Sequence, residues 1–156
     1  MRVDYWGYDG ARHRGDLIVR SDVASTVAGV FGKLYAGRFQ IRRIHPVTQY
    51  GSSDESSMAA NNTSAFNCRV VTGGGGWSEH AYGTAIDINP VQNPYVTASG
   101  TVLPPSGRPW TDRMLREPGM ITPNSVSRTA FAAVGWYWGG DWTDPKDYQH
   151  LSLLDR

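Results

Sequence analysis

Hydrophobic positions follow a helical period in two parts of the chain. In the first, one apolar stripe predicts a helix that begins after Ser21 or Asp22, with Gly37 as its stop. The second is a shorter helix expected from 125 to 134, with Gly135 at its end. The apolar residues of the first stripe are Val23, Val27, Val30, Phe31 and Leu34.

Shorter apolar runs predict strands at 17–19, 39–47, 64–72 and 85–89, after an aromatic, turn-rich opening at 5–10. In the run 64–72, Phe66, Cys68 and Val70 alternate with Asn67 and Arg69. We expect the apolar set to face the core and Arg69 to face the opposite side. Cys68, the single cysteine, is then expected to be a small buried hydrophobic residue, and no internal disulfide is possible.

Three polar or flexible segments separate these elements. Residues 51–63 predict a loop with one helical turn around Met58, in a position to line a substrate site. Four glycines at 73–76 predict a hairpin loop, because the Lys-Ser/Thr of a phosphate-binding loop does not follow them. Residues 91–122 predict a long excursion over the surface.

The stretch from Ser78 to Asp87 carries the candidate chemistry. It contains His80 and Asp87, and alternation at 85–89 places Asp87 opposite two isoleucines. A carboxylate in apolar surroundings needs a cation or several hydrogen-bond donors, and imidazole with carboxylate suits zinc. His150, in the sequence Asp147-Tyr148-Gln149-His150, is the natural third ligand. One zinc ion per chain is therefore expected on His80, Asp87 and His150.

The pattern Ser78-x-His80-x-x-Gly83-x-Ala85-x-Asp87, with Asp147-x-x-His150 downstream, resembles a family of zinc peptidases that cut peptidoglycan stem peptides. These are the M15-type D-alanyl-D-alanine carboxypeptidases and L-alanyl-D-glutamate endopeptidases. The resemblance spans about residues 17–153. It implies an α+β fold of the hedgehog/DD-peptidase type, in which a central antiparallel sheet carries the zinc ligands and helices pack on one face.

The resemblance also implies roles for four further residues. Asp147 would act as general base and then general acid, since a turn after Asp144-Pro145 can bring it over the metal. Arg69 would hold the substrate carbonyl or terminal carboxylate, although many relatives place this arginine further upstream in a Tyr-Arg-Ser context. Ser78, the first residue of the motif, and Trp138 are candidate substrate-binding residues. For Trp138 the reason is that a Trp-Gly-Gly-Asp-Trp-like element borders the cleft in relatives.

Length and charge add only broad limits. The 156 residues suit one catalytic domain, and a net charge of +1 argues against nucleic acid as a partner. The chain has no apolar run long enough to span a membrane and no signal peptide at Met1. We expect a monomer that acts outside the cell on the wall, its export signal trimmed; the alternative is a phage lysin made in the cytoplasm.

Three functions are compatible with these residues. A D-alanyl-D-alanine carboxypeptidase is favoured, because the excursion at 91–122 can close one end of the cleft. An L-alanyl-D-glutamate endopeptidase would need an open groove instead. A zinc-stabilised wall-binding module without activity is the third, and the presence of both Asp147 and Arg69 argues against it.

Overall fold

The computed structural model describes residues 1–155 as an α+β fold with small antiparallel sheets. β1 (Arg2–Trp6) and β2 (Arg12–Asp16) form a hairpin that packs on α1 (Ala24–Ala36). Alternation in β1 buries Val3 and Tyr5 against the core. The strand predicted at 17–19 is wrong: these residues belong to no strand, and Leu17 is buried whereas Ile18 is exposed.

The two predicted helices are present and pack together. α1 buries Val27, Val30, Phe31 and Leu34, as its stripe predicted, and ends before Gly37. Its predicted cap is wrong: the helix begins after Val23 without a side-chain cap, because the Asp22 carboxylate pairs with Arg20 at 2.6 Å. α3 (Val126–Ala132) is capped by the Ser125 hydroxyl and packs on α1.

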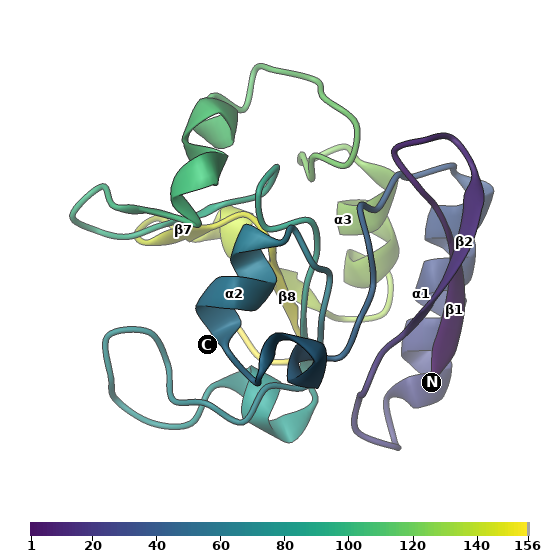
Figure 1. The fold of residues 1–156 in the computed structure, drawn as a ribbon, viewed down its shortest axis with the longest axis horizontal. Helices are drawn as coiled ribbons and strands as arrows, with labels where there is room; N and C mark the ends of the chain where they lie inside the picture. Colours follow the sequence, from purple (N-terminus) through teal and green to yellow (C-terminus); the bar gives the residue numbers. More distant parts are fainter. Residues whose placement is uncertain (156) are drawn as a thin grey trace.

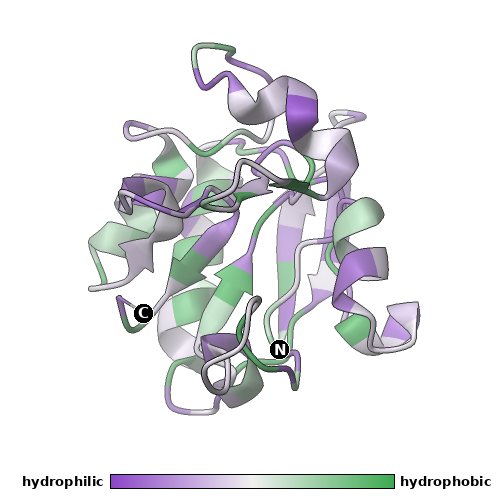
Figure 2. Cartoon of the chain, turned by 90° about the vertical axis from the view of Figure 1, so that its left-hand side faces the viewer, coloured by the Kyte–Doolittle hydropathy of each residue, from purple (hydrophilic) through white to green (hydrophobic). Residues whose placement is uncertain are grey.

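A three-stranded sheet in the order β3-β8-β6 lies at the centre of the molecule. Its strands are β3 (Ala85–Asp87), β8 (His150–Ser152) and β6 (Tyr137–Trp138). Ile86 pairs with Leu151 in the core, and Asp87 pairs with His150. Figure 1 shows α1 and α3 on one side of β8, and hydrophobic segments (green in Figure 2) lie on the central strands. The predicted α+β fold is confirmed.

The excursion at 91–122 is folded rather than loose. It forms the hairpin of β4 (Tyr95–Val96) and β5 (Val102–Leu103), followed by the 3-10 helix η3 (Pro105–Thr111). β4 also pairs with β7 (Lys146–Asp147). Arg113 fixes the segment, since its guanidinium donates four hydrogen bonds of 2.6–2.9 Å to main-chain and amide oxygens and lies 4.4 Å from the Tyr148 ring centroid.

Two further predicted strands are also wrong. Residues 39–47 make only isolated bridges, to Trp6 and Thr63, before the 3-10 helix η1 (Val47–Tyr50). Most of 64–72 is irregular, and its burial is the reverse of that expected: Phe66, Cys68 and Val70 are exposed, whereas Asn67 is buried. Asn67 faces inward because its backbone N–H donates to His80 and its side chain donates to Asp54.

The remaining elements are short and surround the central sheet. They are α2 (Asp54–Ala59), the 3-10 helix η2 (Glu79–Tyr82) and the 3-10 helix η4 (Gly139–Asp141). α2 is the helical turn predicted around Met58. The glycines 73–76 form the end of a hairpin whose sides meet at a Val70–Trp77 bridge. Among residues 1–155, no helix combines the length and apolar character needed to cross a membrane.

Candidate metal centre

Three separate elements bring His80, Asp87 and His150 together. His80 lies on η2, which begins at Ser78 and is ended by Gly83 in the left-handed conformation. Gly83 has no room for a side chain, because a Cβ there would lie 2.7 Å from the backbone nitrogen of Arg20. Asp87 ends β3 and His150 begins β8, and the antiparallel register places the two directly opposite each other.

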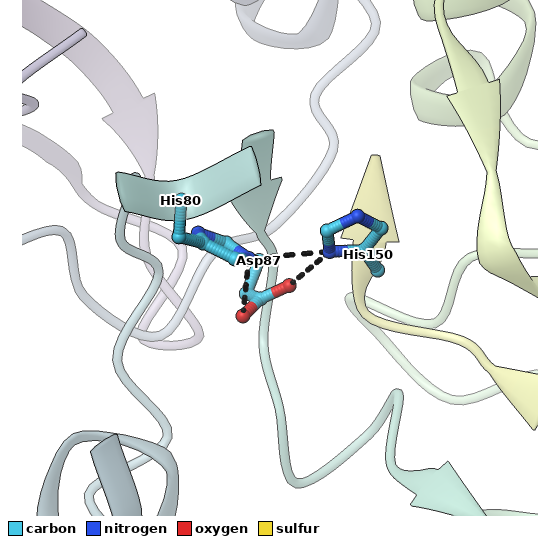
Figure 3. A group of neighbouring side chains, drawn as sticks. All are labelled: His80, Asp87 and His150. Carbon is cyan, nitrogen blue, oxygen red and sulfur yellow. Dashed lines mark hydrogen bonds and ion pairs between the residues drawn. The ribbon is translucent and has the colours of Figure 1, made fainter. Parts of the chain in front are cut away.

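The donor atoms of the three side chains converge. His80 Nε2 lies 3.1 Å from Asp87 Oδ2 and 3.2 Å from His150 Nδ1, and His150 Nδ1 lies 3.2 Å from Asp87 Oδ1. Figure 3 shows the Asp87 carboxylate directed at both rings. All three residues are buried, and one ligand atom from each lies within 4.8 Å of the others.

Hydrogen bonding and charge prepare these donors for a cation. His80 Nδ1 lies 2.6 Å from the Ala65 carbonyl, so Nδ1 carries a proton and donates there, and Nε2 is the ring atom that faces Asp87 and His150. Burial alone lowers the pKa of His80, but the Asp87 carboxylate outweighs it and leaves that pKa above its ordinary value. Burial raises the pKa of Asp87, yet the two histidines reverse this, so that pKa lies well below its usual range.

This set fits a zinc ion. With metal–ligand bonds of about 2.0–2.2 Å and tetrahedral geometry, donor atoms lie roughly 3.3–3.6 Å apart, close to the separations present here. Two imidazoles and one carboxylate are also a common three-ligand set for a catalytic zinc site, in which a fourth position is left for water. The backbone carbonyl behind His80 supplies the outer-shell contact that orients such ligands.

A cavity of about 360 Å³ opens over His150. α2 supplies Asp54 and Met58 to its wall, and the β4–β5 hairpin supplies Tyr95 and Leu103, so both segments outside the central sheet reach the site. The remaining lining residues are Arg69, Val71, Thr72, Trp77, Ser78, Glu79, Trp142, Pro145, Asp147 and Gln149.

Asp147 lies in the cavity wall beside His150. The chain bends at Tyr148 and Gln149, between β7 and β8, and this bend lets residues three apart face the same space. Asp147 Oδ1 is fully buried and has no hydrogen-bond partner within residues 1–155. Burial, reinforced by the Asp87 charge, raises the pKa of Asp147 to about 7, although His150 and Arg69 oppose the shift. Such a carboxyl can exchange a proton near neutral pH.

The structure brings Arg69 to the cavity, but for a reason other than strand alternation. Its side chain is 23% exposed, and its Nε lies 3.2 Å from Asp54 Oδ2. Its charge is close enough to lower the pKa values of His80 and Asp147. The cavity is therefore lined by the Arg69 guanidinium, the Asp147 carboxyl and one of the three candidate ligands, His150.

Comparison with known proteins adds the family. The model of a family described as D-alanyl-D-alanine carboxypeptidase matches residues 72–153, slightly more than half of the chain. The chain belongs to the M15 peptidase family. It is thus a hydrolase of the metallopeptidase class, and the buried His-Asp-His cluster fits the metal site of such an enzyme. No curated protein and no solved structure matched the chain.

Of the two candidate substrate-binding residues of this M15 peptidase, one lines the cavity and the other does not. Ser78 is buried, lines the cavity, and accepts a hydrogen bond from the His80 backbone at 3.3 Å. Trp138 is not brought to the cavity: it lies in the core, and its indole N–H donates to the Tyr148 carbonyl at 2.8 Å. Trp142, from the same aromatic segment, lines the cavity instead and packs near the His150 ring, with centroids 5.6 Å apart.

The sequence placed segments 51–63 and 91–122 beside the substrate site but did not single out the residues in them that line the cavity. These are Asp54 in the first segment and Tyr95 and Leu103 in the second, and none belongs to a recognisable chemical pattern. An acid in the first turn of a helix is usually explained by its favourable interaction with the helix dipole. That explanation gives no reason to expect the contact between Asp54 and Arg69 that the structure contains.

Proposed function

We propose that this protein is a single-domain zinc D-alanyl-D-alanine carboxypeptidase that acts on peptidoglycan stem peptides outside the cell. The observation that carries the proposal is the buried cluster of His80, Asp87 and His150. Its member His150 lines a cavity that Asp147 and Arg69 also line. His80, Asp87 and His150 would hold zinc, which when bound supplies Lewis-acid activation of a water and of the substrate carbonyl.

The chain's own residues supply the proton transfer and the orientation of the peptide. Asp147 takes a proton from the attacking water on its carboxylate and returns it to the leaving amine; this role is typically worth about 10²- to 10⁴-fold in rate. Its raised pKa supports this role, since a carboxyl near pKa 7 is both a usable base and a usable acid at neutral pH. Arg69 binds the terminal carboxylate of the substrate through charge-assisted hydrogen bonds.

The preference for an exopeptidase rests on the cavity wall. Arg69 is the only Lys or Arg among the lining residues within 1–155, and the β4–β5 hairpin places Tyr95 and Leu103 against the same space. This cation is a partner for a substrate that ends in one carboxylate, because an unpaired carboxylate is costly to bury. Met58 and Val71 add apolar wall that can contact alanine side chains.

The test is mass spectrometry of a defined stem pentapeptide ending in D-Ala-D-Ala, digested with and without a chelator. We expect release of one D-alanine, abolished by the chelator. Charge-assisted hydrogen bonds contribute roughly 1.5–3 kcal/mol. Amidation of the peptide C-terminus should therefore lower kcat/KM about 10- to 100-fold.

Two variants sharpen this test. Arg69→Ala should remove most of the discrimination against the amidated peptide, because no other Lys or Arg within residues 1–155 lines the cavity to bind the carboxylate. Arg14→Ala is the matched control, since Arg14 lies exposed on β2 and does not line the cavity. Cleavage between L-Ala and D-Glu, with D-Ala-D-Ala intact and no effect of amidation, would establish the endopeptidase in its place.

A further inference from the structure

The helix α2 turns one face toward the cavity, although it carries none of the family's motif residues. Asp54 and Met58 are four residues apart, on the same side of the helix, and both line the cavity. Met58 Sδ lies 3.6 Å from the Gln149 amide nitrogen, next to His150 in the chain. The helix is therefore a fixed wall of the site.

Asp54 uses both oxygens of its carboxylate in contacts outside its own helix. Oδ1 accepts a hydrogen bond from Asn67 Nδ2 at 2.9 Å, and Oδ2 lies 3.2 Å from Arg69 Nε. Asn67 is itself fixed, because its backbone N–H donates to the His80 carbonyl at 3.1 Å. These contacts connect α2, Arg69 and the turn that carries His80.

Helix capping does not account for this carboxylate. The Ser53 side chain already caps α2 by accepting a hydrogen bond from the Ser56 N–H at 3.1 Å. The adjacent Glu55 places a second acid in the same first turn while remaining exposed. An acid that stabilised only the helix dipole would have no need to contact Arg69.

We propose that Asp54 is the positioning residue for Arg69: its ion pair holds the guanidinium toward the cavity, so that affinity for the substrate carboxylate depends on it. This inference rests on the proposed function for the role of Arg69. A side chain with the length of arginine has many rotamers, and fixing it before the substrate arrives removes an entropy cost from binding. Asp54 would act through Arg69 and have no contact with the scissile bond.

The experiment is a double-mutant cycle on the stem peptide that the wild type cleaves, with variants Asp54→Asn, Arg69→Ala and the pair together. Asp54→Asn keeps the shape of the side chain and an acceptor for Asn67. Glu55→Gln is the matched control, because it removes the same charge from the same helical turn without touching Arg69. Zinc content and melting temperature of each variant check that the fold and the metal site are retained.

We expect Asp54→Asn to raise KM about tenfold with kcat changed less than about twofold, and Glu55→Gln to change neither. In the Arg69→Ala background the Asp54 substitution should have almost no further effect, because its target is absent. Equal effects of Asp54→Asn in both backgrounds, or a loss of kcat at constant KM, would overturn the proposal. So would equal effects of Asp54→Asn and Glu55→Gln.

A second measurement separates this inference from the proposed function. The Nε–H signal of Arg69 in a nitrogen–proton correlation spectrum reports its contact with Asp54 without any substrate. Asp54→Asn should shift that signal and speed its exchange with water, and Glu55→Gln should leave it unchanged. An unchanged signal in Asp54→Asn refutes the positioning role. A wild-type enzyme that releases no D-alanine refutes the carboxypeptidase, whatever the signal does.

Discussion

Zinc binding should appear as thermal stability that depends on His150. The perturbation is His150→Ala, which removes one of three converging donors from a buried site. A ligand that binds only the folded state at 100 times its Kd stabilises it by about 2.7 kcal/mol. For a domain of this length, 1 kcal/mol corresponds to roughly 2–4 °C in Tm, so zinc should raise the wild-type Tm by about 5–11 °C.

The substitution also affects the metal-free protein, and the two effects must be kept apart. Asp87 Oδ1 lies 3.2 Å from His150 Nδ1, so His150→Ala leaves a buried carboxylate with one partner fewer. That loss typically costs about 1–3 kcal/mol without any metal. The decisive quantity is therefore the difference in Tm between zinc-loaded and chelator-treated samples of each variant, and not the Tm itself.

The assay is calorimetric or fluorescence-detected unfolding across a zinc titration, with elemental analysis of the same samples. The control is His13→Ala, since His13 lies on the exposed β2 strand and pairs with Asp9. We expect the full zinc increment in His13→Ala and most of it lost in His150→Ala. An undiminished increment in His150→Ala, with one zinc still bound per chain, would refute the ligand assignment.

Three other results are expected. Asp147→Asn should bind zinc normally and lose at least about 100-fold in kcat, measured by D-alanine release, and near-normal turnover would leave Asp147 without a proton-transfer role. In the metal-free protein, the folded-state pKa of Asp147 (about 7) exceeds its unfolded value, so its contribution to stability is present below about pH 4 and is lost as pH rises toward 7. Urea unfolding at several pH values should show that the free energy of unfolding depends less on pH in Asp147→Asn than in the wild type. An equal dependence on pH in both proteins contradicts the raised pKa. Gly139→Ala should lower kcat with zinc retained, because the new Cβ would lie 2.6 Å from the Asp147 carbonyl oxygen, whereas Gly29→Ala, in open space, should leave kcat unchanged.

The sequence predicted the parts of the site whose chemistry is local. The spacing of His80 and Asp87 around Gly83 identified two of the converging side chains, because a short turn and the strand after it determine their positions. The helical stripe at 23–34 was also sufficient to predict α1, since a period of 3.6 over twelve residues leaves little ambiguity.

Long-range contacts explain where prediction from the sequence was wrong. Burial in 64–72 is decided by Asn67, which bonds with Asp54 and His80, and no alternation rule contains those partners. Arg69 was assigned to the cavity on the assumption of a strand that does not exist, and an ion pair from α2 places it there instead. The two-residue strands β4, β5, β6 and β7 are too short for any periodic signal.

The pairing of Asp87 with His150 has a consequence for synthesis of the enzyme. A ribosome that has translated only as far as β3 has made His80 and Asp87, but β8 is still more than sixty residues away. On the proposed ligand set, a nascent chain therefore lacks its third zinc ligand until β8 has left the exit tunnel and closed that long loop. Arrested chains ending before residue 150 should be inactive even when zinc is abundant, which ties the onset of proteolysis to completion of the fold.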